Sequence, residues 1–192
     1  MEATKAVNFH RNDALVVSTS SALRDWSQVS ERRDLDVDIS DCMDRAPAVG
    51  LGLALAKPES KVLVLDCDST LRTNLGGLAT IGESNPQNLV HFVFDDASST
   101  STSGIPIKEM DSLDLAQIAN SSGYTKVYEF DKLEELLIGL EEIMRQTGPV
   151  FVRVKVFRTG EPNPYPDRSM AQSWAVVREH LSPPSSNNEY SK

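Results

Sequence analysis

The chain has 192 residues, of which 40% are hydrophobic and 24% are charged, a composition that fits one globular domain and excludes a wholly disordered chain. Its formal net charge of -9 repels nucleic-acid phosphates, so no nucleic-acid partner is expected. Sparse cysteines, Cys42 and Cys67, suit a reducing cytoplasm, and no apolar run suggests a membrane span. We therefore expect a cytoplasmic protein with a single domain over 1–181 and a polar tail over 182–192.

Short apolar runs rich in β-branched residues alternate with helix-like stretches, which is typical of parallel strands joined by crossover helices. Strands are predicted at 14–17, 35–39, 61–65, 88–94, 126–128 and 150–156. The last of these is expected to be half exposed or near a sheet edge. Helices are predicted at 18–26, 48–56, 70–83, 112–119, 131–145 and 171–181. The fold class is therefore α/β, with a parallel sheet sandwiched by helices.

Acidic side chains follow two of the predicted strands directly. Asp66 and Asp68 come after the strand at 61–65. Asp95 and Asp96 end the next strand, and a segment made almost entirely of Ser and Thr comes after them. Parallel α/β proteins bind ligands at the carboxyl ends of their strands, and carboxylates there suit a divalent cation.

The segment from Val62 to Thr70 resembles the haloacid dehalogenase phosphatase signature, four apolar residues followed by Asp-x-Asp-x-Thr. This resemblance implies that Asp66 is a nucleophile and Asp68 a general acid/base, both helping to hold Mg²⁺. The acidic pair that should complete such a site lies on the very next strand, which leaves no room for the elements that should intervene. A phosphatase is therefore kept only as the second alternative.

A second resemblance covers more of the chain. A small-residue helix over 48–56 precedes the strand, and Cys67-Asp68-Ser69-Thr70 follows it. Then come Asn74-Leu75-Gly76-Gly77-Leu78-Ala79-Thr80-Ile81 and, after a further strand, Asp95-Asp96. In this order the motifs resemble the pyrophosphate-binding (PP) domain of thiamine-diphosphate enzymes, most closely the cofactor-binding subunit of sulfopyruvate decarboxylase and the matching part of phosphonopyruvate decarboxylase. The resemblance implies the thiamine-diphosphate-binding fold.

The resemblance also implies a binding site for thiamine diphosphate and Mg²⁺. The implied metal ligands are Asp68, Asp96 and the backbone carbonyl of Ser98. The residues implied to contact the cofactor are Ser18, Thr19, Ser20, Ser21, Asp41, Met43, Ser69 and Thr70. Among them the hydroxyl-rich strand end supplies hydroxyls and helix N-terminal amides to the phosphates, and Met43 wedges the cofactor into its bent shape.

Several positions depart from the family pattern. Cys67 and Ser69 stand where the Gly-Asp-Gly motif has glycines, and Asp41 and Asp44 stand at both glycines of a Gly-x-Met-Gly turn. Asp96 replaces an asparagine. Added carboxylates repel a diphosphate, so a degenerate, non-catalytic subunit is the first alternative.

The implied reaction is the decarboxylation of a small 2-oxo acid such as sulfopyruvate. In the family, the glutamate that activates the cofactor lies on a separate pyrimidine-binding domain, and this chain is too short for both domains. We therefore expect no catalytic residue in this chain. The expected partner is a pyrimidine-binding subunit that supplies the glutamate, and self-association is also expected.

Overall fold

The computed structural model describes residues 1–96, 113–157 and 160–182. Within them, six parallel strands form one sheet in the order β2-β1-β3-β4-β6-β5. The strands are β1 (Leu15–Ser18), β2 (Asp36–Asp38), β3 (Val62–Cys67), β4 (Leu89–Asp95), β5 (Lys126–Phe130) and β6 (Val150–Lys155). The helices are α1 (Glu2–His10), α2 (Ser20–Val29), the 3-10 helix η1 (Ser40–Arg45), α3 (Ala46–Ala56), α4 (Asp68–Leu71), α5 (Gly76–Ser84), α6 (Leu115–Ser121), α7 (Leu133–Arg145) and α8 (Met170–Leu181).

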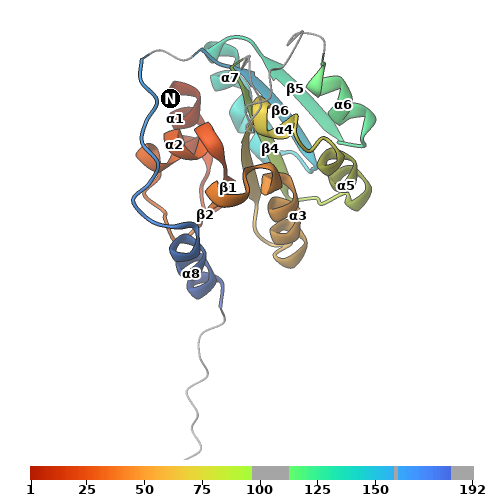
Figure 1. Ribbon diagram of the computed structural model, residues 1–192. Coiled ribbons are helices and arrows are strands. Elements are labelled where there is room, and N and C mark those ends of the chain that lie inside the picture. The colour runs from red at the N-terminus through yellow and green to blue at the C-terminus, as the bar shows by residue number, and fades with distance from the viewer. Residues whose placement is uncertain (97–112, 158–159, 183–192) are drawn as a thin grey trace, which may run out of the picture.

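Helices cover both faces of the sheet (Figure 1), which confirms the predicted fold class. Apolar residues of α1, α2 and α7 pack on one face, and those of α3, α5, α6 and α8 pack on the other. The central strands are buried on both faces, as their continuous apolar sequences predict. All six strands point the same way, so their carboxyl ends share one edge of the sheet.

The small-residue helix α3 lies close against β3. A Cβ atom built on Gly50 would lie 2.2 Å from Cγ2 of Val64, so a side chain at this position would force the helix or the strand to move. Gly52 lies two residues further along the helix, and a Cβ atom built on it has nothing within 4 Å. The close contact explains why the sequence of α3 is rich in glycine and alanine on the side that faces the sheet.

One expectation about secondary structure is met in part and another is wrong. Strand β6 lies near an edge of the sheet, with only β5 outside it, but it is not half exposed, because Val150, Phe151 and Val152 are fully buried. The single helix predicted over 70–83 is two helices, α4 and α5. The break falls where the side chain of Asn74 donates to a backbone carbonyl of η1, just before a pair of glycines with low helix propensity.

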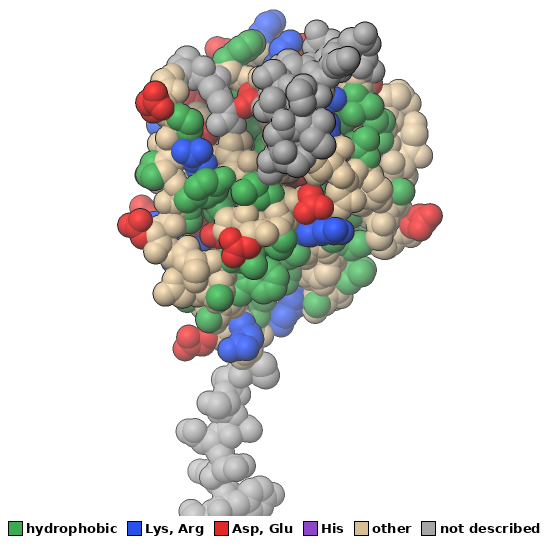
Figure 2. Space-filling view, viewed as in Figure 1, with side chains coloured by type: hydrophobic (Ala, Val, Ile, Leu, Met, Phe, Trp, Pro, Cys, Tyr) green, Lys and Arg blue, Asp and Glu red, His purple; other side chains and the backbone are tan. Residues whose placement is uncertain are grey.

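Helix α8 packs beside β2 and α3 and leaves apolar side chains on the surface. A groove of about 610 Å³ lies there, lined by Val49 and Leu53 of α3 and by Trp174 and Leu181 of α8. Figure 2 shows apolar side chains gathered in the lower part of the molecule, where Figure 1 places these two helices. The boundary between the domain and the tail after residue 181 stays a prediction. None of the described helices is long and apolar enough to cross a membrane.

Candidate functional site

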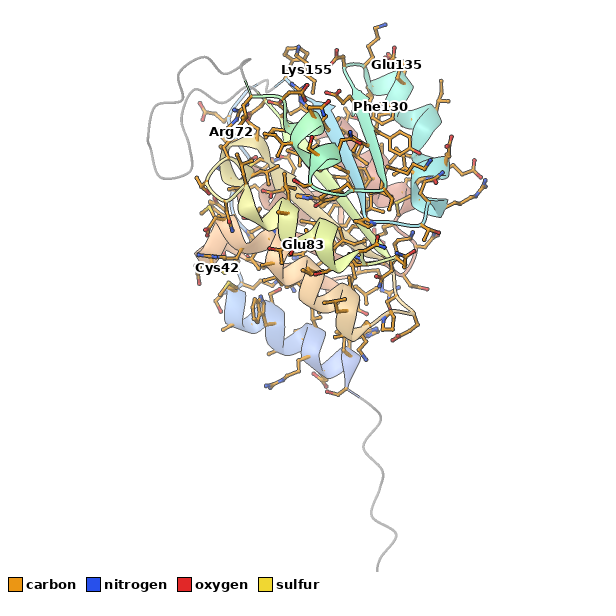
Figure 3. The ribbon with its side chains drawn as sticks, turned by 90° about the vertical axis from the view of Figure 1, so that its right-hand side faces the viewer. Cys42, Arg72, Glu83, Phe130, Glu135 and Lys155 are labelled. Atoms are coloured by element: carbon orange, nitrogen blue, oxygen red, sulfur yellow. The ribbon has the colours of Figure 1, made fainter. Side chains whose placement is uncertain are left out.

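The segments that follow β1, β2, β3 and β4 meet at the carboxyl edge of the sheet. β1 leads into α2, β2 into η1, and β3 into α4, and η1 contacts both α2 and α4. β4 ends beside β3, with Phe94 paired to Cys67. In Figure 3, Arg72 directly after α4 and Cys42 of η1 lie along the same side of the molecule. This edge is therefore the place where such a sheet binds ligands.

Asp68 begins α4 and is only 1% exposed. Burial, followed by the charges of Asp95 and Asp96, raises the pKa of Asp68 to about 6. The guanidinium Nε of Arg72 lies 3.9 Å from Oδ2 of Asp68 and has a smaller, opposing effect on its pKa. The carboxylates predicted to bind metal are therefore close enough to repel one another.

Asp95 has a cationic partner that sequence reasoning missed. Nε and Nη2 of Arg153 lie 2.7 Å from Oδ2 of Asp95, and Nη1 of the same guanidinium lies 2.9 Å from Oε2 of Glu129. The three side chains come from β4, β5 and β6. Only the strand order brings them together, so no local sequence signal could have found this pair.

The predicted cofactor turn at 41–44 is fixed from both sides. The hydroxyl of Thr19 donates to the carbonyl of Met43 at 3.0 Å, and the side-chain amide of Asn74 donates to the carbonyl of Asp44 at 3.0 Å. Asp41 is exposed and Met43 is half-buried. The structure thus brings together three segments that the sequence singled out separately, at β1, η1 and the loop before α5.

The hydroxyl-rich segment at the end of β1 divides into two parts. Ser18 and Thr19 are fully buried, whereas Ser20 and Ser21 are half-buried at the first turn of α2. Ser20 has a φ of 51°, a left-handed conformation that is uncommon for serine and is often found at functional sites. Ser20, Ser21 and the N-terminal amides of α2 are therefore the part of this segment best placed for a phosphate.

The segment at the Gly-Asp-Gly position adopts an ordinary backbone. Cys67 is extended, with a φ of -126° and a ψ of 158°, so this position does not require the conformational freedom of glycine. The hydroxyl of Ser69 lies 3.3 Å from Sγ of Cys67. Thr70 is fully buried, and its hydroxyl contacts the carboxylate of Asp66, so the Thr70 side chain is engaged inside the protein.

Asp66 points into the protein and not toward the edge of the sheet. Its residue is 1% exposed, and Oδ1 accepts hydrogen bonds from the backbone N–H of Cys67 at 2.8 Å and from the hydroxyl of Thr70. Oδ2 lies 3.5 Å from Nε2 of His91. A nucleophile must reach its substrate, so this geometry argues against the phosphatase interpretation.

The donor set at this edge fits a divalent cation that carries a diphosphate. Asp68 and Asp96 end neighbouring strands, and carboxylate oxygens suit Mg²⁺. A cation would relieve the repulsion that raises the pKa of Asp68. No group of three metal-binding His, Cys, Asp or Glu side chains occurs among the described residues, and Ser98, the third predicted ligand, lies outside them.

Comparison with known proteins gives consistent matches. Residues 19–154 match the family described as thiamine pyrophosphate enzyme, C-terminal TPP binding domain. Phosphonopyruvate decarboxylase from Streptomyces viridochromogenes is 34% identical over 144 residues, which cover 75% of this chain and 36% of the relative. Sulfopyruvate decarboxylase subunit beta from Methanothermobacter thermautotrophicus is 36% identical over 114 residues, covering 59% of this chain and 58% of the relative. The chain thus spans about a third of the first relative and somewhat more than half of the second.

A solved structure supports the fold. A protein from Mycobacterium smegmatis, described as a thiamin diphosphate-dependent enzyme, superposes on 81% of this chain with a TM-score of 0.68 and 15% sequence identity, and the match covers 31% of that protein. At 15% sequence identity the match supports a statement about the fold and about nothing else. It agrees with the arrangement of strands and helices described above.

Proposed function

This chain belongs to the family of thiamine pyrophosphate enzyme C-terminal TPP-binding domains, which its residues 19–154 match. We propose that it is the cofactor-binding subunit of a decarboxylase. Its substrate would be a short 2-oxo acid of the sulfopyruvate or phosphonopyruvate type. The two kinds of relative that support this assignment are named for decarboxylation of these acids. The observation that carries the proposal is the position of Asp68 and Asp96 directly after the adjacent strands β3 and β4, inside the segment that matches the family.

Each part of the carboxyl edge has a task in this proposal. Asp68 and Asp96 would hold Mg²⁺, together with the carbonyl of Ser98. Ser20 and Ser21, at the N-terminus of α2, would donate hydrogen bonds to the diphosphate. When bound, thiamine diphosphate supplies an electron sink for the carbanion that decarboxylation leaves.

The segment after β2 would contact the organic part of the cofactor. Met43 is half-buried, and its backbone is held by Thr19, so its position is set before any ligand binds. The backbone at Asp41 would face the aminopyrimidine. Burial, followed by the charges of Asp44 and Asp41, raises the pKa of the Cys42 thiol. That thiol therefore stays protonated near neutral pH and adds no charge to the site.

The active site would be completed by a second subunit. The relatives from methanogens are named as beta subunits, which supports a partner that carries the pyrimidine-binding domain and its glutamate. This chain would then position the cofactor and exclude water from one side of it, and the partner would cover the other side. Self-association of two such pairs is a further part of the proposal.

Reconstitution tests this function. The purified chain is mixed with pyrimidine-binding subunits from the same genome, thiamine diphosphate and Mg²⁺, and carbon dioxide release is measured from sulfopyruvate and phosphonopyruvate. We expect no turnover by either subunit alone and turnover by the mixture. Asp68→Ala should abolish turnover, whereas Glu83→Ala, on the exposed side of α5, should leave it unchanged.

Three outcomes would revise the proposal in different ways. Decarboxylation by this chain alone would remove the need for a partner. Cofactor binding without turnover by any mixture would favour the degenerate subunit, for which the replaced motif glycines Cys67 and Ser69 are the motivating observation. Hydrolysis of an aryl phosphate that disappears in Asp66→Asn would favour the phosphatase.

A further inference from the structure

A buried polar chain lies beneath the start of α4, and of its members only Thr70 is among the cofactor contacts that the family resemblance implies. It runs from Tyr124 through His91 to Asp66 and Thr70. The phenol oxygen of Tyr124 lies 3.1 Å from Nδ1 of His91, and Nε2 of His91 lies 3.5 Å from Oδ2 of Asp66. His91 is fully buried and Tyr124 is 4% exposed, so the chain is shielded from water.

The protonation of this chain follows from its surroundings. Burial, followed by the charge of Asp66, raises the pKa of Tyr124 well above its usual value, so the phenol keeps its proton. In the tautomer of His91 that accepts a hydrogen bond at Nδ1, the Tyr124 hydroxyl is the donor. In that tautomer the hydrogen on Nε2 faces Oδ2 of Asp66, and at 3.5 Å the two atoms are in contact without a full hydrogen bond. The ring of Phe151 packs edge-on against both His91 and Tyr124, at 5.4 and 5.6 Å between centroids, and limits how far either ring can turn.

Asp66 transmits this constraint to the turn that carries Asp68. Its Oδ1 accepts the N–H of Cys67 at 2.8 Å and contacts the hydroxyl of Thr70. That hydroxyl also lies 3.3 Å from the same N–H. The peptide unit that joins Asp66 to Cys67 is therefore held by two acceptors, and this fixes the direction in which α4 begins.

The far end of the polar chain is anchored by close backbone packing. Tyr124 follows Gly123, which has a φ of 100° and lies against Gly82 of α5. A Cβ atom on Gly82 would lie 1.6 Å from the carbonyl oxygen of Ser122. The chain thus connects the rigid contact between α5 and the end of α6 to the strand end that carries Asp68.

The free-energy cost of burying these polar groups indicates that they have a role other than stability. A buried charged or polar group is often less favourable for stability than an apolar replacement of similar volume. We propose that Asp66 and His91 are positioning residues for the metal ligand Asp68, acting through the backbone of Cys67. This inference rests on the proposed function only where it names Asp68 as a metal ligand. The mechanical coupling of His91 to the Cys67–Asp68 turn can be measured without any ligand.

The test compares His91→Leu with His91→Gln in the full chain. Leu fills similar space without a hydrogen-bond donor, whereas Gln can still donate to Asp66. Two quantities are measured: the hydrogen-exchange rates of the Cys67 and Asp68 amides by NMR, and the affinity for Mn²⁺ in the presence of thiamine diphosphate. Ile143→Val, a mild change at a fully buried residue on the opposite face, serves as the control for stability alone.

We expect His91→Leu to raise both exchange rates and to weaken Mn²⁺ binding, each at least tenfold, and His91→Gln to stay within threefold of the wild type. Ile143→Val should change neither quantity at this turn. If His91→Leu does not fold, Asp66→Asn replaces it, because it places an amide donor opposite the ring N–H. Asp66→Asn should change both quantities in the same direction.

The outcomes separate this inference from the proposed function. Unchanged exchange at Cys67 and Asp68 in a folded His91→Leu protein would overturn the positioning role. Faster exchange with unchanged Mn²⁺ affinity would overturn it as well, since the turn would then be held for stability alone. A wild-type chain that binds neither Mn²⁺ nor thiamine diphosphate would overturn the cofactor assignment, while the exchange rates would still decide whether His91 fixes the turn.

Discussion

Two buried carboxylates, Asp36 in β2 and Asp68 at the start of α4, meet opposite surroundings. Asp36 is 5% exposed and is fully compensated. Its carboxylate accepts hydrogen bonds from the guanidinium of Arg11 at 2.8 Å, the indole of Trp26 at 2.9 Å and the hydroxyl of Ser30 at 2.6 Å. This region of the molecule, beneath α1 and α2, uses a buried charge to join three segments of the fold.

Asp68 is equally buried, but besides the guanidinium of Arg72 it has other carboxylates near it. Asp95 and Asp96 raise its pKa in the same direction as burial does. A structural carboxylate is surrounded by donors, whereas a carboxylate kept among like charges at a strand end marks a place where a cation can add stability. The contrast between Asp36 and Asp68 therefore separates a structural charge from the charge that we propose binds the metal.

The largest expected effect would come from removing the structural carboxylate. Asp36→Ala leaves the guanidinium of Arg11 buried without its partner, and we expect a loss of about 3–5 kcal/mol in the free energy of unfolding. Urea denaturation measures it. Asp13→Ala is the control, because the Asp13 side chain is 86% exposed and pairs with Arg32 at the surface, where such pairs contribute about 1 kcal/mol or less. Similar losses of unfolding free energy in Asp36→Ala and Asp13→Ala would contradict the structural role of Asp36 on which the contrast with Asp68 depends.

The second prediction concerns the ligand. Thiamine diphosphate with Mg²⁺, each at about 100 times its dissociation constant, should stabilise the chain by about 2.7 kcal/mol, because it binds only the folded state. Thermal unfolding with and without the ligands measures this gain. Asp68→Ala should abolish it and Glu83→Ala should keep it. A gain that survives Asp68→Ala would remove Asp68 from the metal site.

The third prediction is the pH dependence of Asp68. Its folded pKa of about 6 lies above the ordinary value of 3.8, so the folded chain binds this proton more tightly than the unfolded chain. Ionisation therefore costs stability as the pH rises between these values, and the full cost is present above about pH 6. Without divalent cations, Asp68→Asn should stabilise the protein by about 2 kcal/mol near pH 7.5 and by little near pH 4. An equal gain at both pH values would contradict a buried, repelled carboxylate.

The smallest expected effect tests the packing of α3 against β3, the strand that leads to Asp68, without changing a charge. Gly50→Ala places a methyl group against Val64 of β3, and overpacking offset by better helix propensity should cost about 1 kcal/mol. Gly52→Ala, in the same helix and with open space around it, should instead gain up to about 1 kcal/mol. Loss of stability in both variants would mean that α3 needs flexibility and not close contact.

Much of this protein was determined by local sequence. Continuous apolar runs such as Val62–Leu65 are long enough for strands and too short for helices, so their assignment did not depend on context. Small residues in α3 predicted its close approach to the sheet. Asp68 and Asp96 could be placed at one edge because parallel strands must end on the same side, and the ordered motifs around them indicated the family.

Only the tertiary structure decided the rest. The alternation of polar and apolar residues in β6 indicated a strand that is half exposed or near an edge, yet Arg153 is polar because it pairs with Asp95 of the neighbouring strand β4. His91 and Asp66 are 25 positions apart and have no spacing that marks them as partners. They meet because β3 and β4 are neighbours and both side chains point to the same face, beneath the turn that carries Asp68. Local sequence fixes which segments become strands, but the choice of neighbours depends on the packing of the whole sheet, and that choice decides which charges are compensated.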